Sequence, residues 1–244
     1  MHGVAGVLSA MLVSSPAVAK DLSVALSESV VAITTQFAGA DLLLFGAKQG
    51  KGDVVVVVRG PVQDQTVRRK DRVAGIWINR AEVAFDRIPA FYAIAANRPI
   101  GEFMQPDVRR RNQIGVEYID LTPKEKPASA DDLRRFREAL IRNKQAAGLY
   151  SAKIGNVQFL TDQLFSTRIH FPANVIVGTF GVDVHLVRNG EIALTETKLI
   201  NVRKIGVEAS VYDFAHRQSF AYGILAIVIA VVAGWAANAA FKKK

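Results

Sequence analysis

The amino-acid sequence predicts a mainly β fold: Ig-like antiparallel β-sandwich modules with a helical insertion and one C-terminal transmembrane helix. Three observations lead to this fold class. Short apolar runs separated by Gly, Pro and Asn recur over residues 22–105 and again over 157–205, an amphipathic pattern lies between these regions, and residues 220–241 carry no charged side chain. Short strands at this spacing are typical of sandwiches, and a long uncharged apolar run is typical of a membrane span.

Residues 20–105 are the first predicted β domain. Its candidate strands contain the apolar runs 30–33, 42–45, 54–58, 76–78 and 91–94. The run 54–58 consists of valine alone, and because β-branched residues favour strands, we expect a central strand that is buried on both faces. Trp77, Phe91 and Tyr92 are expected in the core, with an aromatic ligand-binding patch as the alternative.

Residues 106–156 are predicted to contain a linker followed by an amphipathic helix. Prolines at 106, 123 and 127 interrupt the linker. Ser129 can cap the start of the helix, and Gly148 can end it. The apolar face would contain Leu133, Phe136, Leu140 and Ile141, and the opposite face Arg134, Arg135, Arg142 and Lys144. We expect this helix to pack on a sheet; the alternative is a basic helix lying on a membrane surface.

Residues 157–205 are predicted to form a second β-module. Apolar residues at 180, 182, 184 and 186 alternate with Gly181, Asp183 and His185, which is the period of a half-buried strand. Asn189 and Gly190 then predict a hairpin turn. Residues 206–219 would form a juxtamembrane linker. The sequence leaves open whether the two β-regions are separate domains or one sandwich with a helical insertion.

Both ends of the chain carry membrane-related signals. Residues 1–19 are mostly apolar or small and end in Ala17-Val18-Ala19, which predicts a cleaved signal peptide; an uncleaved helix or a buried segment is the alternative. Residues 220–241 would rise about 33 Å as a helix, enough to cross a bilayer core. The tail 242–244 is predicted to stay in the cytoplasm. The protein would then be a single-pass inner (cytoplasmic) membrane protein, with the bulk of the chain periplasmic.

Small residues recur at helical spacing in the predicted anchor and form a candidate packing face for another membrane helix. They are Gly223, Ala226, Ala230, Ala233, Gly234 and Ala237. Lipid exposure of an ordinary span is the alternative. Three cytoplasmic anchor charges follow: Lys242, Lys243 and Lys244.

The net charge of +9 comes from 31 basic and 22 acidic residues, and the chain has no cysteine. The basic clusters 68–70, 109–111 and 134–137 are expected to be ordinary solvated surface; attraction to anionic headgroups or to an acidic partner is the alternative. Because the sequence has no basic–aromatic recognition motif, no nucleic-acid partner is expected. The lack of cysteine excludes disulfides and thiolate chemistry.

The sequence predicts no catalytic, cofactor-binding or metal-binding residues. It has no G-x-S-x-G or H-E-x-x-H motif, and the spacing of Gly46, Gly50 and Lys51 does not match a phosphate-binding loop. His170, His185 and Asp183 are the candidate metal ligands. We expect these histidines to be exposed or singly hydrogen-bonded.

Several blocks of the sequence resemble the alphaproteobacterial putative transmembrane protein family. The blocks are 39–47 (GADLLLFGA), 56–61 (VVVRGP), 72–79 (RVAGIWIN), 91–93 with 98–99, 171–175 (FPANV), and 222–223 leading to 234–235. Ile176 departs from the family pattern, in which proline is expected. The resemblance implies a signal, a β-rich exported region and one anchor, and it brings no assigned activity. It also points to sulfite-exporter-like membrane proteins as genomic neighbours of some members.

These observations favour a non-enzymatic membrane protein with two partners, the lipid bilayer and a polytopic membrane protein. The exported β-region would act as a binding or assembly surface of an accessory subunit, for example of a sulfite-exporter-like transporter. One alternative is a periplasmic ligand- or metal-binding sensor, or a weak enzyme, that uses His170, His185 and Asp183. Another is a structural envelope protein whose basic faces contact lipid headgroups.

Overall fold

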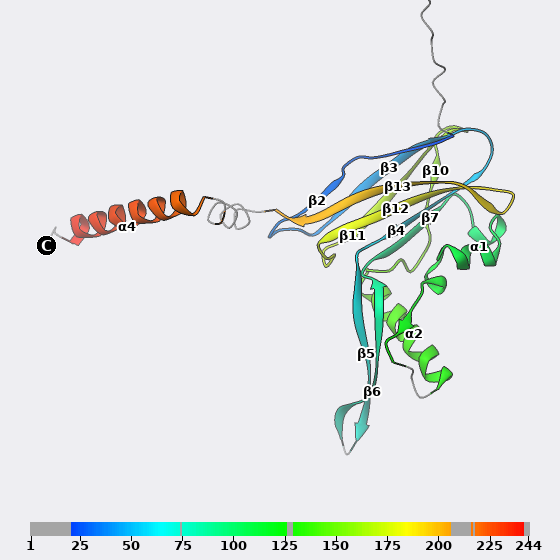
Figure 1. The fold of residues 1–244 in the computed structure, drawn as a ribbon, viewed down its shortest axis with the longest axis horizontal. Helices are drawn as coiled ribbons and strands as arrows, with labels where there is room; N and C mark the ends of the chain where they lie inside the picture. The colour runs from blue at the N-terminus through cyan, green and yellow to red at the C-terminus, as the bar shows by residue number, and fades with distance from the viewer. Residues whose placement is uncertain (1–20, 74, 126–128, 206–215, 217, 242–244) are drawn as a thin grey trace, which may run out of the picture.

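The computed structural model describes residues 21–73, 75–125, 129–205, 216 and 218–241 of the 244-residue chain. The predicted signal peptide, most of the juxtamembrane linker and the lysine tail lie outside the described residues. Within them, the protein is mainly β, as predicted, with strands arranged in three sheets (Figure 1).

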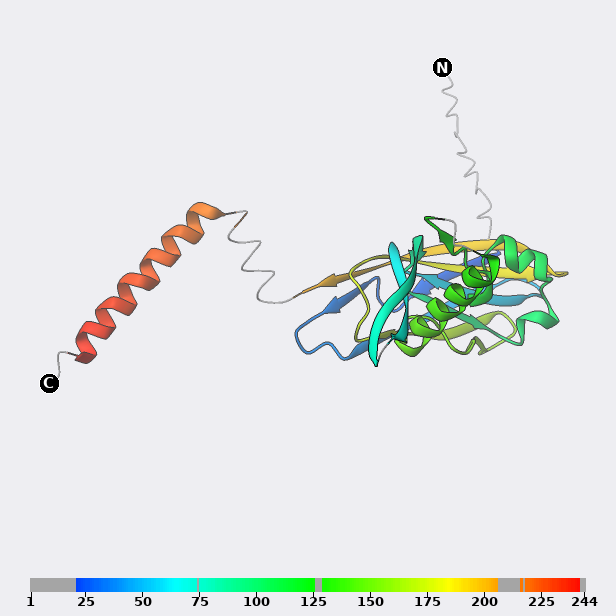
Figure 2. The same ribbon diagram turned by 90° about the horizontal axis from the view of Figure 1, so that it is seen from below.

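Two of the sheets form a sandwich. The four-stranded sheet has the order β1 (Leu22–Leu26), β3 (Gly39–Lys48), β11 (Leu164–Pro172), β10 (Gln158–Phe159). The six-stranded sheet has the order β2 (Val30–Ile33), β13 (Glu191–Lys204), β12 (Gly178–Arg188), β4 (Asp53–Arg59), β7 (Tyr92–Ala96), β9 (Gly155–Asn156). Their strands run along the long axis of the body in Figures 1 and 2.

The two predicted β-regions share both sheets. Strand β3 pairs with β11, β4 pairs with β12, and β2 pairs with β13. The expectation of two separate modules is therefore wrong, and the structure has the other arrangement that the sequence leaves open: one sandwich with a helical insertion. The sandwich is also not purely antiparallel, because β2 runs parallel to β13 and β9 runs parallel to β7.

The first core lies between the two sheets and is closed by aromatic rings. The ring centroids of Phe91 and Phe171 are 5.3 Å apart, and those of Phe171 and Phe180 are 5.4 Å apart. Gly46 makes room for Phe165, because a Cβ at Gly46 would lie 2.5 Å from the Phe165 ring. Such contacts at native packing density fix how the sheets face each other.

A second core covers the opposite face of the six-stranded sheet. Its lid consists of α1 (Pro106–Arg111), α2 (Ala130–Ala146) and two short 3-10 helices, η1 (Ile100–Glu102) and η2 (Val116–Tyr118). Val54, Val56 and Val58 point into the first core. Val55 and Val57 point into the second. This confirms the prediction of a central strand that is buried on both faces.

Helix α2 confirms the sequence prediction for its cap and its apolar face. The Ser129 hydroxyl accepts a 3.0 Å hydrogen bond from the Asp132 backbone N–H, and Phe136 and Leu140 are buried in the second core. The apolar face of the helix therefore packs against the second core, as expected. The stretch before it is not a simple linker, however, because its described residues contribute four buried apolar side chains: Val108, Ile114, Ile119 and Leu121.

The predicted turn between β12 and β13 is also confirmed. Asn189 has φ +52° and Gly190 has φ +83°. Positive φ at both central positions is the signature of a type I′ hairpin. This turn sets the register of the two longest strands of the six-stranded sheet.

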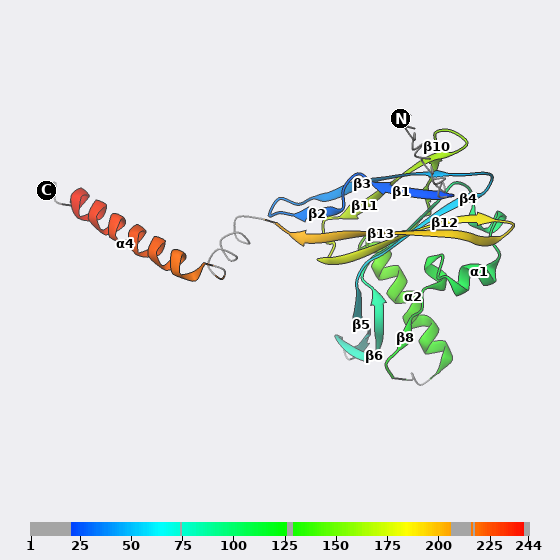
Figure 3. The same ribbon diagram turned by 45° about the horizontal axis from the view of Figure 1, so that its top comes forward.

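A third sheet projects from the body. It consists of a long hairpin, β5 (Val62–Val73) and β6 (Ile76–Pro89), with a short third strand β8 (Thr122–Pro123) at its base. Figures 1 and 3 show the hairpin extending away from the sandwich beside α2. The expectation that Trp77 is a core residue is wrong, because its side chain is 64 % exposed near the end of this hairpin, whereas Phe91 and Tyr92 are buried as expected.

The last helix, α4 (Ser219–Phe241), follows the sandwich in the chain and lies apart from it in Figure 1. Its described apolar side chains, such as Ile227, Val231 and Trp235, are exposed. Taking the described residues alone, the structure contains no helix of the length and apolarity needed to cross a membrane.

Candidate functional site

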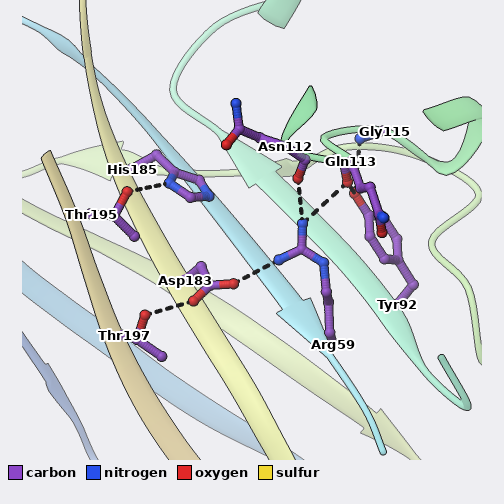
Figure 4. Close-up of polar contacts among 9 residues, drawn as sticks. All are labelled: Arg59, Tyr92, Asn112, Gln113, Gly115, Asp183, His185, Thr195 and Thr197. Carbon is purple, nitrogen blue, oxygen red and sulfur yellow. Dashed lines mark hydrogen bonds and ion pairs between the residues drawn. The ribbon is translucent and has the colours of Figure 1, made fainter. Parts of the chain in front are cut away.

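A polar network lies where the six-stranded sheet meets its helical lid (Figure 4). The Arg59 guanidinium, at the end of β4, is the centre of the network. Arg59 donates a 2.6 Å hydrogen bond through Nη1 to Oδ2 of Asp183 on β12. The second oxygen of Asp183 accepts a 2.7 Å bond from the Thr197 hydroxyl on β13. Both carboxylate oxygens therefore have a partner, and three adjacent strands are joined.

The same arginine holds the loop after α1. Its Nη2 donates to the carbonyl oxygens of Asn112 and Gln113, at 2.7 and 3.3 Å. The Tyr92 hydroxyl donates to the Gln113 carbonyl and accepts from the Gly115 N–H, both at 2.8 Å. Burial raises the pKa of Tyr92 above its ordinary value, so the phenol stays protonated and can donate. The network thus ties the helical lid to the sheet.

His185 is a buried neighbour of this network. Its Nδ1 lies 2.9 Å from the Thr195 hydroxyl, and among the described residues its Nε2 is buried without a hydrogen-bond partner. Burial lowers the pKa of His185 to about 4. The negative charge of Asp183 opposes this shift in part, and the positive charge of Arg59 adds to it by a smaller amount. The imidazole is therefore neutral at neutral pH.

The structure separates His170 from the other two candidate metal ligands, Asp183 and His185, which are neighbours on β12. His170 lies on the outer face of the four-stranded sheet, 2.7 Å from Asp41, while His185 lies on the lid side of the six-stranded sheet. Asp183 is bound to Arg59 and Thr197. Within the described part of the chain, no group of three or more His, Asp or Glu side chains can hold a metal ion.

A cavity of about 410 Å³ lies beside Arg59, between the hairpin base and the segment after α1. Its lining contains two arginines and two aspartates: Arg59, Arg87, Asp86 and Asp120. The charges of these two arginines and two aspartates sum to zero, so the cavity offers no net charge to a ligand. We interpret the network as a structural clamp.

The outer face of the four-stranded sheet carries an exposed apolar row. Leu43, Phe45 and Leu164 are 42, 44 and 47 % exposed. In the pairing register Phe45 lies opposite Ser166 and Leu164 opposite Ala47, so the three apolar side chains are neighbours. The solvent face of an antiparallel sheet is normally polar. An apolar row in this position is the type of surface that binds another protein.

The predicted packing face of the anchor falls within α4. The six residues of that face are Gly223, Ala226, Ala230, Ala233, Gly234 and Ala237. At the helical repeat they occupy about 100° of the helix circumference. All are at least partly exposed in the structure. The cytoplasmic charges Lys242, Lys243 and Lys244 lie outside the described residues.

Many of the clustered basic residues have nearby carboxylates. Arg68 pairs with Glu82 at 2.8 Å, Arg111 with Glu191 at 3.6 Å, and Arg134 with Asp131 at 3.0 Å. These pairs are exposed and contribute little to stability. They are consistent with the expected solvated surface for most of the basic clusters.

Sequence reasoning did not find the Arg59 network or the exposure of the hairpin end. Arg59 and Asp183 are far apart in the chain, and only the pairing of β4 with β12 brings them together. The hairpin left a readable signal: polar residues occupy both alternating faces of 63–72. Strands that are buried on both faces read as continuous apolar runs, so this polar stretch indicates that much of the hairpin is exposed.

The family model described as "Putative transmembrane protein (Alph_Pro_TM)" matches residues 21–243 of this chain. The match covers the sandwich, the projecting hairpin and α4. No curated protein matches the chain.

Proposed function

Because the chain belongs to this transmembrane protein family, we propose that it is a non-enzymatic, single-pass inner-membrane accessory subunit. In this proposal α4 crosses the bilayer, the lysine tail is cytoplasmic, and the signal peptide directs the sandwich to the periplasm. The sandwich, used in the manner of an Ig-like binding module, and the anchor together bind one polytopic membrane protein, for example a transporter of the sulfite-exporter kind.

The length and sequence of α4 support the anchor. It has 23 residues, which rise about 35 Å, more than the hydrocarbon thickness of a bilayer. Between residues 220 and 241 the sequence has no Asp, Glu, Lys or Arg. This uncharged stretch includes positions whose side chains lie outside the described residues. Three lysines at the end of the span match the positive-inside rule.

The apolar row of Leu43, Phe45 and Leu164 is the observation that carries the binding role. Each of these side chains is more than 40 % exposed on a sheet face that no described residue covers. Burial of such side chains against a partner gains roughly 25 cal/mol for each Å² of apolar area. The small-residue face of α4 would add close helix contacts inside the membrane.

Co-purification from crosslinked native membranes tests this function. The full-length tagged chain is compared with Leu43→Thr/Phe45→Thr and with Gly223→Leu/Ala226→Leu/Ala230→Leu. We expect a polytopic membrane protein to be recovered with the native chain and to be lost or strongly reduced with each variant. Threonine keeps the β-propensity of the strand while removing the apolar surface.

Two matched variants control for nonspecific effects. Leu199→Thr changes an exposed apolar residue on the six-stranded sheet, and Val228→Leu/Val232→Leu enlarges the side of α4 opposite the small residues. Both should leave recovery unchanged. Equal recovery of the same protein with all variants would rule out these two contact surfaces, and recovery of no polytopic protein with the native chain would rule out the accessory role.

A further inference from the structure

The end of the β5–β6 hairpin exposes large apolar side chains. We call residues 70–79, apart from the undescribed residue 74, the hairpin tip. Within it Ile76, Trp77 and Ile78 are 68, 64 and 44 % exposed. The neighbouring Gly75 has φ +83° at the turn. Three consecutive exposed residues of this size are unusual on a surface that faces only water.

The strand register distributes these residues over both sides of the hairpin. Arg72 lies opposite Trp77, and Asp71 lies opposite Ile78. Residues opposite each other in an antiparallel pair point to the same side. Trp77 therefore shares its side with Arg72, and Ile76 and Ile78 occupy the other side. If one side of the hairpin tip packed against the body, the apolar side chains on the other side would stay exposed. An apolar environment that surrounds the tip, such as a lipid interface, covers both sides.

The charge around these apolar residues is positive. Residues 68–82 include five basic and two acidic side chains. Glu82 pairs with Arg68, and Asp71 lies within 4.0 Å of Arg69 and 3.8 Å of Arg80. The local acids are thus already engaged, while Lys70 and Arg72 are exposed beside Trp77. Tryptophan flanked by cations is the combination found at the interface between water and an anionic bilayer.

The hairpin and the anchor segment leave the body near the same end. Arg59, the last residue of β4, pairs with Gly181, and Gly181 pairs with Leu199 of β13. Strand β13 continues past Leu199 to Lys204, and the hairpin begins at Val62, just after Arg59. In Figures 1 and 3, β13 reaches the left end of the sandwich, and the hairpin leaves the underside nearer to that end than to the other and points across the long axis.

The lengths of the two segments are compatible with one membrane surface. Ile76 lies seven residues beyond buried Val83 along β6, which corresponds to about 23 Å of strand. The segment between Lys204 and Ser219 has 14 residues and can span at most about 50 Å. The hairpin tip and the start of α4 can therefore meet the same bilayer face.

We propose that the hairpin tip inserts Trp77, Ile76 and Ile78 into the headgroup region of the bilayer that holds α4, while Lys70 and Arg72 bind anionic lipid phosphates. The hairpin then acts as a second membrane contact that sets the orientation of the sandwich. This inference rests on the proposed anchoring by α4, and two separate tryptophan reporters distinguish the failure of one from the failure of the other.

The experiment uses full-length chain reconstituted into vesicles of phosphatidylcholine, with or without one anionic lipid, phosphatidylglycerol. The chain has two tryptophans, so Trp235→Phe leaves Trp77 as the only reporter and Trp77→Phe leaves Trp235. Brominated phosphatidylcholine quenches tryptophans that enter the bilayer. We expect Trp77 to be quenched and blue-shifted in anionic vesicles and much less in neutral ones, whereas Trp235 is quenched in both.

Charge variants in the Trp77-only chain complete the test. Lys70→Gln/Arg72→Gln should abolish most of the Trp77 quenching in anionic vesicles. Arg110→Gln/Arg111→Gln, which removes the same charge from exposed positions on α1, should leave it unchanged. If Trp77 stays accessible to aqueous acrylamide in anionic vesicles while brominated lipid quenches Trp235, the hairpin tip does not insert and the inference is overturned. A protein would then be the partner that covers the hairpin tip. If neither is quenched, the proposed anchoring is overturned as well.

Discussion

Arg59 and Asp183, which are 124 residues apart in the chain, form a 2.6 Å ion pair that joins the central strand β4 to β12. The pair is about three-quarters buried. Because Arg59 also donates to two backbone carbonyls of the loop after α1, one side chain connects the sandwich to its helical lid.

Asp183→Asn should destabilise the protein by about 1–3 kcal/mol, because the Arg59 charge loses a charged partner at a largely buried position. Denaturant unfolding of the wild type and of Asp183→Asn gives the loss in the free energy of unfolding. The exposed pair of Arg68 and Glu82, at 2.8 Å, is the control, and its removal should cost less than about 1 kcal/mol. Equal effects at the two pairs would contradict the clamp interpretation.

Gly46→Ala should destabilise the sandwich by about 1–3 kcal/mol or more, since the added methyl would meet the Phe165 ring at 2.5 Å and the Ser23 carbonyl at 2.7 Å. Gly181→Ala is the matched change on strand β12, where a Cβ would meet nothing within 4 Å. Thermal unfolding of both variants measures the contrast. A melting temperature for Gly46→Ala equal to that of Gly181→Ala would show that the interface can relax around the methyl.

Ser129→Ala should cost about 1 kcal/mol of stability, because the Asp132 backbone N–H loses its acceptor at the start of α2. Ser129→Asp keeps an acceptor at the cap and should restore most of the loss. Chemical denaturation measures both changes. An alanine variant as stable as the wild type would mean that packing of Phe136 and Leu140 alone fixes the start of the helix.

His185 should make stability fall as the pH decreases from about 6.5 to 4. Burial lowers its pKa to about 4 in the folded protein, whereas the unfolded side chain titrates near 6.5. In this interval the unfolded state binds more protons, so the free energy of unfolding rises with pH and the full contribution is present above about pH 6.5. Across the whole interval the effect is about 3 kcal/mol at most.

The comparison with His185→Leu isolates this contribution. Unfolding free energies of both proteins are measured between pH 4.5 and 7, a range chosen to lie across the interval between the two pKa values. The variant should show a shallower pH dependence than the wild type. Identical slopes would mean that the imidazole is protonated in the folded state at a pH well above 4.

The sequence predicted those features that depend on neighbouring residues. The valines at 54–58 revealed the central strand because burial on both faces removes the alternation of polar and apolar residues. Ser129 and the Asn189-Gly190 turn were recognisable because caps and tight turns depend on a few adjacent residues.

Features that depend on long-range pairing were not predictable in the same way. Nothing near Arg59 identifies Asp183 as its partner, and the parallel pairing of β2 with β13 has no local signature. Trp77 was misplaced because an aromatic residue in a strand is usually buried, and the projection of this hairpin depends on how it leaves the sheet at Gly60 and Pro61.

The interleaved strand order has a consequence for how the chain reaches its native state. The pairs of β3 with β11, β4 with β12 and β2 with β13 each join segments more than 100 residues apart. The first core therefore cannot close during synthesis of the N-terminal half, and loop-closure entropy makes such topologies slow to fold. A chain that stays unfolded until its final strand is synthesised is compatible with the export proposed above, in which the chain crosses a translocation channel before the sandwich forms.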